Sequence, residues 1–331
     1  MRRLGLLLAL IAGQALAAAG PASDAGVLAR LPFGARSLAM GGDHGTLPRD
    51  PLSSVANPAS LSALDAPAVA AGLHQGPDGV SWGGVAGGAP LLPWLAAGGI
   101  VETLGSGEVV AYDYTGVRKA APLESDRLVG AAVAAWFGPM AAGLGARYFG
   151  STVLDRQAGA AVFLDAGVTA RWESLQPPGV PLRGPNPDWV ALSLAVTGFG
   201  TSVDYGGASD LAPLTWRAGA AAGRDLGGGW QGIAAAALEV PRATARPEVH
   251  GGLEVAVPAG PVEAAVRAGA RYRRDGGVLS VGAGASFRGV ALDYALLSAD
   301  NPFGPTHHVT LGFNWGRYGR AAVPESGAGE P

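Results

Sequence analysis

The sequence predicts an all-β protein: a transmembrane antiparallel β-barrel of about 14 strands with an N-terminal hatch or plug segment. First, apolar and polar residues alternate with a period of two along most of the chain. Second, turn residues separate the alternating runs at intervals of about 10 to 15 residues. Third, runs of 10 to 12 residues match the ~9 to 11 residues with which a tilted strand crosses a bilayer.

The chain begins with the features of a secretory signal peptide. Arg2 and Arg3 precede an apolar run that ends at Leu16, and small residues follow. This run is shorter than the ~20 residues of a membrane-spanning helix, which favours an export signal over an anchor. We therefore expect a cleaved signal peptide at 1–19, a hatch at 20–65, a barrel at 66–315 and a flexible tail at 316–331. Such a barrel is expected in the outer membrane of a Gram-negative cell, in contact with its lipid.

The alternation is clearest in the C-terminal half of the chain. From Val262 to Tyr272 the even positions are apolar, whereas the odd positions include three charged residues, and the run at 248–257 repeats this pattern. In a barrel the apolar face meets lipid and the polar face lines the lumen. A similar run at 162–172 is interrupted by Phe163, which stands on the polar face. The expected lumen-facing polar residues are Glu248, His250, Glu254, Glu263, Arg267, Arg271 and Asp293.

Fourteen strands account for the alternating runs. An even number returns both ends of the barrel to the periplasmic side. Short turns such as 138–139 alternate with longer stretches such as 105–125 and 200–212, although a long connection at 173–187 breaks this rule. The expected strands lie near 67–73, 79–88, 92–104, 126–137, 140–149, 158–172, 188–199, 213–224, 229–240, 246–257, 262–273, 277–287, 289–298 and 306–315.

Two other architectures fit parts of the pattern. A helical membrane protein would explain the uncharged run at 128–146, but Gly138 and Pro139 break this run in the middle. A soluble β-sandwich would need a polar outer face, whereas the consistent face of these strands is apolar. A closed barrel also pairs every backbone polar group within the sheet, as lipid requires.

Composition excludes several function classes. The absence of cysteine removes disulfides, thiolate zinc sites and a cysteine nucleophile. A formal net charge of −3 provides no basic field for nucleic acid. No nucleophile elbow occurs, and the adjacent His307 and His308 face opposite sides of a strand, so they cannot chelate one metal ion together. We expect a non-enzymatic protein without cofactor or metal.

A motif precedes the first expected strand. Its elements within residues 34–64 are Gly34-Ala35-Arg36, Met40-Gly41-Gly42, Asp50-Pro51 and Asn57-Pro58-Ala59. This pattern resembles the N-terminal signature of the FadL-like outer-membrane proteins, especially the PorV/PorQ branch, in which the stretch folds as a hatch. The resemblance implies that Gly34, Arg36, Met40, Gly41, Gly42, Asp50, Asn57 and Pro58 form the hatch motif, and that Arg36 and Asp293 join the hatch to the wall.

The segment 289–315 resembles the last hairpin of the same family. Gly312, Phe313 and Trp315 fit the glycine–aromatic signal that the barrel-assembly machinery reads, and we expect both aromatic residues to lie on the closing strand and face lipid. Further aromatic residues are candidates for interfacial girdles or for ordinary packing: Trp94, Trp136, Tyr148, Trp172, Trp189, Trp216 and Trp230.

The resemblance implies two alternative functions. The first is transport of hydrophobic or amphipathic small molecules across the outer membrane, which predicts an apolar pocket beside the hatch. The second is a non-transporting outer-membrane component, similar to PorV and PorQ, that assists the secretion of proteins or surface assembly. It predicts a sealed lumen and contact with secreted proteins through the loops at 105–125 and 200–212.

Overall fold

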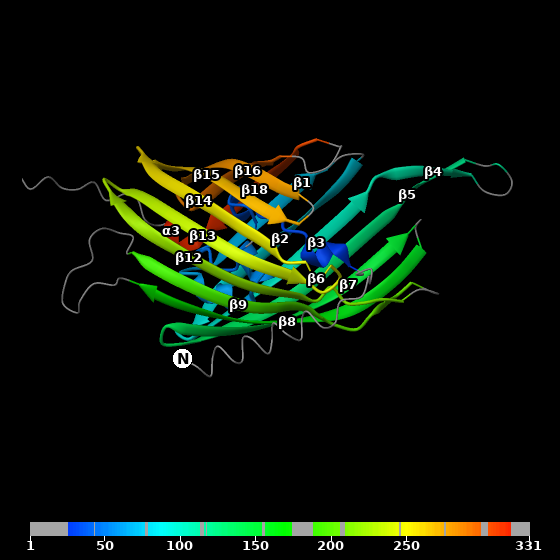
Figure 1. Ribbon diagram of the computed structural model, residues 1–331, viewed down its shortest axis with the longest axis horizontal. Coiled ribbons are helices and arrows are strands. Elements are labelled where there is room, and N and C mark those ends of the chain that lie inside the picture. The colour runs from blue at the N-terminus through cyan, green and yellow to red at the C-terminus, as the bar shows by residue number, and fades with distance from the viewer. Residues whose placement is uncertain are drawn as a thin grey trace, which may run out of the picture.

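Fourteen antiparallel strands form a closed barrel in the computed structural model (Figure 1). In the order of the chain they are β1 (Ala68–Gln75), β2 (Val80–Leu92), β3 (Leu95–Ser106), β6 (Glu124–Phe137), β7 (Met140–Val153), β8 (Arg156–Glu173), β9 (Trp189–Gly200), β12 (Thr215–Gly227), β13 (Trp230–Pro241), β14 (Glu248–Ala259), β15 (Val262–Arg273), β16 (Gly276–Phe287), β17 (Val290–Leu297) and β18 (Thr306–Asn314). Pairing of β1 with β18 closes the sheet.

The structure describes residues 26–42, 44–76, 79–112, 116, 118–153, 156–173, 188–205, 209–244, 246–274, 276–298 and 304–318. The expected signal peptide, the tail beyond residue 318 and the connection from 174 to 187 lie outside these residues. The fourteen-stranded barrel predicted from the alternation is confirmed.

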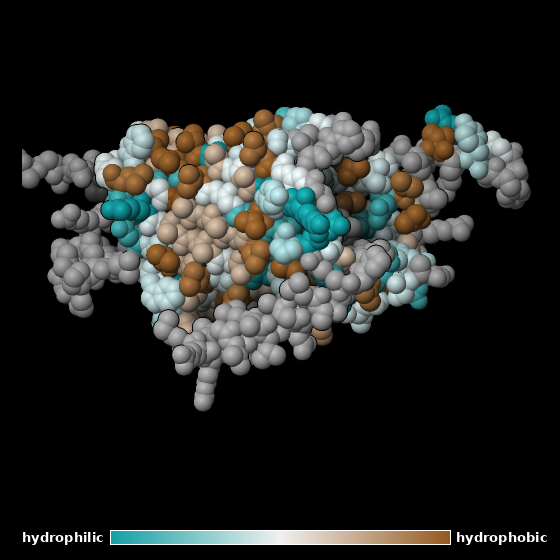
Figure 2. Space-filling view, in the orientation of Figure 1, coloured by the Kyte–Doolittle hydropathy of each residue, from teal (hydrophilic) through white to brown (hydrophobic). Residues whose placement is uncertain are grey.

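Side chains alternate between the two faces of the wall. On β15, Val266 is 64% exposed, whereas the next residue, Arg267, is 8% exposed. Leu253 of β14 and Leu311 of β18 also point outward. Figure 2 shows apolar residues, in brown and tan, spread over the wall. The outer face is therefore apolar, as a bilayer requires, and the charged side chains lie in the lumen.

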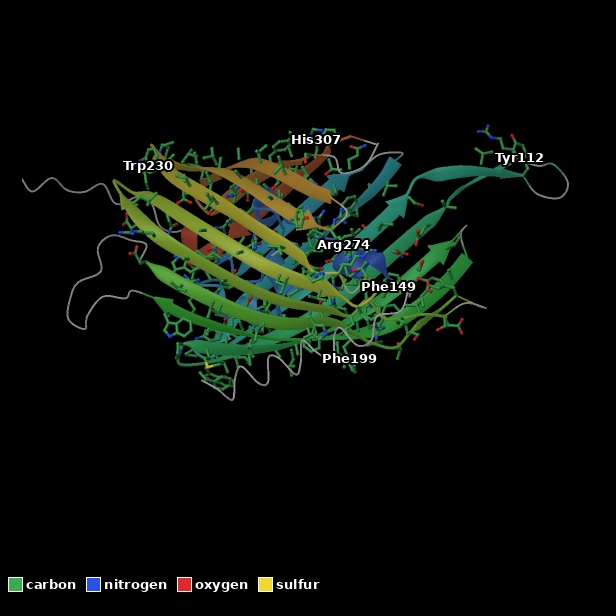
Figure 3. The ribbon with its side chains drawn as sticks, viewed as in Figure 1. Tyr112, Phe149, Phe199, Trp230, Arg274 and His307 are labelled. Atoms are coloured by element: carbon green, nitrogen blue, oxygen red, sulfur yellow. The ribbon has the colours of Figure 1, made fainter. Side chains whose placement is uncertain are left out.

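The two rims of the barrel differ. We call the rim where β1 begins and β18 ends the proximal rim, and the opposite one the distal rim. Proximal connections include the tight turns 138–139 and 260–261. Two distal connections contain hairpins of their own, β4 (Glu108–Tyr112) with β5 (Arg118–Pro122) and β10 (Val203–Asp204) with β11 (Ser209–Asp210). The stretches 105–125 and 200–212, expected as loops, thus contain short hairpins, and the β4–β5 hairpin, which carries Tyr112, projects beyond the barrel (Figures 1 and 3).

Trp315 lies elsewhere than the sequence predicts, and two other tryptophans take the packing alternative. β18 ends at Asn314, so Trp315 begins the short helix α3 (Trp315–Tyr318) instead of ending the closing strand. Its ring still packs edge-on against Phe313, with centroids 4.6 Å apart. Trp136 and Trp189 do not belong to a lipid-facing girdle, because their positions on β6 and β9 face the lumen and both pack inside the barrel.

The hatch, residues 26–66, lies inside the barrel. It contains η1 (Val27–Arg30), α2 (Ala35–Ala39), η2 (Pro51–Val55) and η3 (Pro58–Ala63). The carboxylate of Asp50 accepts the N–H of Leu52 at 2.9 Å, and the Asn57 side chain accepts that of Ala59 at 2.9 Å. Each thereby caps a short helix whose first residue is proline. Proline suits this position because it lacks the backbone N–H that would have no partner within the helix.

Wall glycines seat the hatch. A side chain on Gly143 would overlap the backbone of Ala59, and one on Gly252 would overlap that of Met40. Four more wall glycines meet the hatch in the same way: Gly167, Gly219, Gly269 and Gly282. The hatch therefore packs directly against the backbone of wall glycines around much of the lumen, which explains part of the glycine content of the chain.

Candidate functional site

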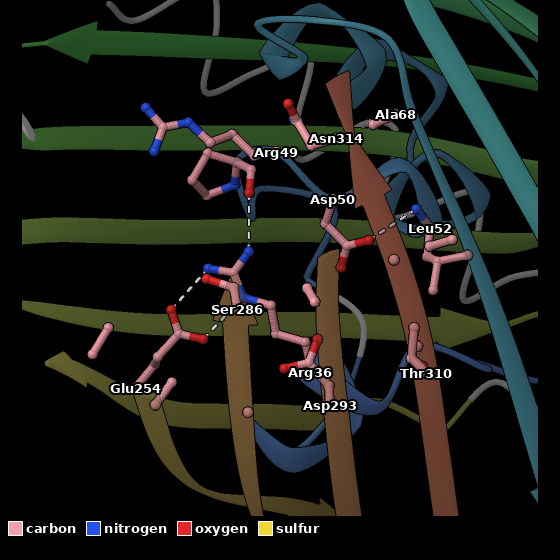
Figure 4. Close-up of a pocket in the computed structure, with 18 of the residues that line it drawn as sticks. Arg36, Arg49, Asp50, Leu52, Ala68, Glu254, Ser286, Asp293, Thr310 and Asn314 are labelled. Carbon is pink, nitrogen blue, oxygen red and sulfur yellow. Dashed lines mark hydrogen bonds and ion pairs between the residues drawn. The ribbon is translucent and has the colours of Figure 1, made fainter. Parts of the chain in front are cut away.

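A network of ion pairs joins the hatch to the wall in the proximal half of the lumen (Figure 4). Arg36 of α2 donates through Nε and Nη2 to the two carboxylate oxygens of Glu254, at 2.9 and 2.8 Å. Its Nη1 donates to the carbonyl oxygen of Pro48 at 3.0 Å. Bidentate pairs of this kind are among the stronger hydrogen-bonded contacts in proteins. We call Arg36, Glu254, Arg267 and Asp293 the anchor.

The wall half of the anchor crosses neighbouring strands. Glu254 on β14 lies opposite Arg267 on β15 and forms a second ion pair with it. Arg267 in turn donates through Nη1 to Asp293 of β17 at 2.7 Å. Gly284 of β16 makes room between them, because a side chain there would overlap both Arg267 and Asp293. Thus Glu254 is the carboxylate that pairs with Arg36, whereas Asp293 pairs with Arg267.

A cavity of about 220 Å³ lies beside the anchor. Besides the anchor, charged residues such as Asp50 and Glu263 line it. Burial raises the pKa of the Asp50 carboxyl, while Arg36 and the Leu52 N–H oppose this shift. This cavity is lined by charged as well as apolar residues and so differs from the apolar pocket that hydrophobic transport predicts beside the hatch.

A turn follows α2 and brings two histidines together. Met40 is fully buried, Gly41 has a φ of 92°, and a side chain on Gly42 would overlap the ring of His250. The rings of His250 and His44 have centroids 6.5 Å apart. Burial lowers the pKa of His44 to about 4, so its imidazole is neutral at pH 7. The turn therefore places the neutral His44 next to His250 where the hatch meets the wall.

The other residues singled out in the sequence are spread around the lumen. Asn57 Nδ2 donates to the Val168 carbonyl at 3.3 Å and to Thr169 Oγ1 at 3.2 Å, which ties η3 to β8. Glu248 lies opposite Glu239, and Arg271 opposite His250, so neither belongs to the anchor. The candidate residues therefore form one cluster and several separate contacts.

An apolar cluster occupies the part of the distal lumen that β6, β7 and β8 bound. Phe149 and Phe163 stack at its centre with ring centroids 5.9 Å apart (Figure 3 labels Phe149). Leu28 and Ala29 of the hatch are buried within it. We call the whole set the distal cluster: Leu28, Ala29, Leu128, Phe149, Ala161, Phe163, Val203 and Ala212, with Trp82, Ile100, Leu104 and Tyr205 packed against it. The only sequence signal for it was Phe163, which stands where the alternation calls for a polar residue.

A buried ion pair lies next to the distal cluster. Arg147 of β7 donates through Nη2 to Asp165 of β8 at 2.7 Å and through Nη1 to the Ala29 carbonyl at 3.0 Å. Asp165 also accepts the N–H of Gly198 at 2.8 Å. The arginine thus holds the leading end of the hatch as well as its carboxylate partner. Sequence reasoning missed this pair because its partners are 18 residues apart on strands without clear charge alternation.

Within the described ranges, no group of three or more His, Asp or Glu side chains is arranged to hold a metal ion. No helix in that part of the chain is long and apolar enough to cross a membrane.

A closed barrel with an apolar outer face and a packed internal hatch defines the class of outer-membrane β-barrel proteins. No family model and no curated protein matches the sequence. Among solved structures, the chain is similar to the toluene transporter TbuX of Ralstonia pickettii, with a TM-score of 0.51 and 11% identity over 85% of this chain and 98% of that one. Two others are the toluene transporter TodX of Pseudomonas putida (TM-score 0.46, 10% identity, 85% and 96% covered) and a Pseudomonas aeruginosa FadL homologue (0.44, 10%, 86% and 98%). The likeness to TbuX shows a shared fold.

Proposed function

We propose that this protein carries small hydrophobic molecules across the outer membrane and that the distal cluster is its binding site. The distal cluster supports this proposal most strongly. Lumens of outer-membrane barrels are polar as a rule, because they hold water or a polar plug. Here the part of the lumen bounded by β6, β7 and β8 is lined by stacked aromatic and aliphatic side chains instead. The fold shared with a structure described as a toluene transporter supports the same conclusion.

The hatch acts as the gate in this proposal. Its leading end places Leu28 and Ala29 among the apolar wall residues that would contact a ligand. Its middle part is held by the anchor and by the wall glycines. A hydrophobic molecule arriving from the distal side would therefore displace residues 26–33 first, while the anchored part stays in place.

The division of the chain belongs to the proposal as well. Residues 1–19 act as the cleaved signal, 20–65 as the hatch, 66–315 as the barrel and 316–331 as a tail, with the distal rim at the cell surface. The hatch motif positions the gate, the lumen charges hold it, and Gly312, Phe313 and Trp315 direct insertion by the assembly machinery.

Uptake of radiolabelled toluene by cells carrying the protein tests this function. We expect faster uptake than in cells without it, slower uptake in Phe163→Gln, and faster uptake after deletion of residues 23–33. Phe137→Gln is the matched control, because Phe137 lies on the outer surface next to a proximal turn and is 67% exposed. Uptake equal to that of cells without the protein would refute transport.

A second candidate function draws on the projecting β4–β5 hairpin and on the resemblance of the hatch motif to the PorV/PorQ branch. The protein would then hold secreted proteins at the cell surface. Replacing residues 107–123 by a short glycine turn should abolish co-purification of secreted proteins while leaving the amount of heat-modifiable barrel unchanged. Unchanged co-purification would count against this role.

A further inference from the structure

Two buried acidic side chains lie at the distal cluster: Glu102 and Asp126 of β6, which lies opposite Leu104 and is 3% exposed. Glu102 of β3 faces the lumen and is 1% exposed. Its cross-strand partner on β6 is Leu128, and the next lumen-facing residues on its own strand are Ile100 and Leu104. All three belong to the distal cluster or pack against it, so the carboxyl group is set among apolar neighbours.

The carboxyl group of Glu102 has no hydrogen-bond donor within the described part of the chain. Both of its oxygens are buried and unpartnered. The neighbouring cation, Arg147, donates its hydrogen bonds to Asp165 and to the Ala29 carbonyl instead of to Glu102. On the neighbouring strand β2, Gly84 lies opposite Glu102, and the Glu102 side chain extends over this glycine because it has no side chain of its own.

An unsatisfied buried carboxyl group is costly. Desolvation without a compensating hydrogen bond destabilises a fold, and such groups in native proteins call for a specific explanation. Among the residues that the structure describes, Glu102 closes no ion pair and caps no element. Replacing it by leucine would extend the surrounding cluster, so packing does not account for an acid at this position.

We propose that Glu102 is the specificity-determining residue of the distal cluster and that the cargo is an apolar molecule bearing one hydrogen-bond donor, a hydroxyl or an amino group. This inference rests on the proposed transport function and names its substrate class. An apolar site with a small number of placed polar groups is the usual design for selective binding of a small molecule.

The requirement for a donor follows from the chemistry of the carboxyl group. An ionised carboxylate only accepts hydrogen bonds, and a protonated one keeps its carbonyl oxygen as an acceptor. A ligand hydroxyl or amino group is therefore satisfied in either state. A plain hydrocarbon fills the same space but leaves both oxygens of Glu102 unpaired.

Toluene and 4-methylphenol provide the test, because they differ by one hydroxyl group. Equilibrium binding of each compound to the purified protein in detergent is compared for the wild type, Glu102→Gln, Glu102→Leu and the control Glu124→Gln, which changes an acid outside the distal cluster. We expect the wild type and the control to bind 4-methylphenol about tenfold more tightly than toluene. Glu102→Gln should keep part of this preference, since its amide oxygen still accepts, and Glu102→Leu should lose it.

The outcomes separate the two proposals. An unchanged preference in Glu102→Leu, or none in the wild type while both compounds bind, would overturn the role of Glu102 and leave transport standing. If neither compound bound to any variant, the transport function and this inference would fall together. Glu102→Leu removes a buried polar group, so its barrel should fold, and heat-modifiable migration on a gel checks this.

Discussion

The contact between Arg36 and Glu254 should control how firmly the hatch is held. Substitution of Arg36 by methionine keeps an unbranched apolar stem but removes three hydrogen bonds, two to Glu254 and one to the Pro48 carbonyl. Glu254 would keep Arg267 as its remaining partner. The barrel itself should be unaffected, because Arg36 belongs to no strand.

The magnitude follows from the burial of the pair. The side chains of Arg36 and Glu254 are 19% and 5% exposed. Removing one partner of a buried pair costs about 3 to 5 kcal/mol. Because Glu254 keeps Arg267 as a partner, we expect a cost at the lower end of this range. A loss of about 3 kcal/mol corresponds to a change of about 100-fold in the equilibrium for opening of the hatch.

Hydrogen–deuterium exchange of the α2 region measures this change. The amides of Leu38 and Met40 are hydrogen-bonded to carbonyl oxygens within the hatch, at 3.0 Å each, and exchange when the hatch opens. We expect them to exchange about 100-fold faster in Arg36→Met, with no change in the strands.

The same substitution at Arg49 is the matched control. Arg49 pairs with Asp65 at 3.0 Å, but their side chains are 36% and 41% exposed, and exposed pairs contribute little. Equal acceleration in Arg36→Met and Arg49→Met, or none in either, would refute the anchor.

Three further predictions follow from the same structure. Gly252→Val should prevent the hatch from packing against the wall, because the new side chain would overlap Met40. Limited proteolysis should then cut the hatch while the barrel stays intact. In the control Gly105→Val the new side chain meets open space, so the hatch should resist proteolysis as in the wild type. The opening equilibrium of the hatch, taken from exchange at α2 after division by the intrinsic exchange rate at each pH, should shift toward the open state as the pH falls from about 6.5 to about 4, because His44 takes up a proton once it is released. Asp50 acts in the opposite sense, and a pH profile unchanged in His44→Gln would exclude His44 as the cause. Phe313→Asp should block insertion because it places a charge on the lipid side of the closing strand, and normal amounts of heat-modifiable barrel would contradict this.

The wall of the barrel was accessible to sequence reasoning because strand periodicity is local. Val266 and Arg267 are neighbours in sequence, and their opposite faces follow from the backbone alone. Trp189 shows the limit of this reasoning: an aromatic residue at a strand end suggests a girdle, but its parity on β9 turns it inward.

Contacts across the lumen were not accessible in the same way. Arg36 and Glu254 are 218 residues apart, and which carboxylate meets the arginine depends on the path of the hatch inside the barrel. The distal cluster depends on that path as well, since Leu28 meets Phe149 and Phe163 only after the sheet has closed. Phe163, alone on a polar face, was the one local sign of it.

Locking the leading end of the hatch tests the central claim most directly. The chain has no cysteine, so Leu28→Cys together with Leu128→Cys introduces one pair of thiols within the distal cluster. Toluene uptake should be lost when these thiols are cross-linked and should return on reduction, because the ligand has to displace Leu28. Equal uptake in the cross-linked and reduced forms would contradict a hatch that gates an apolar lumen.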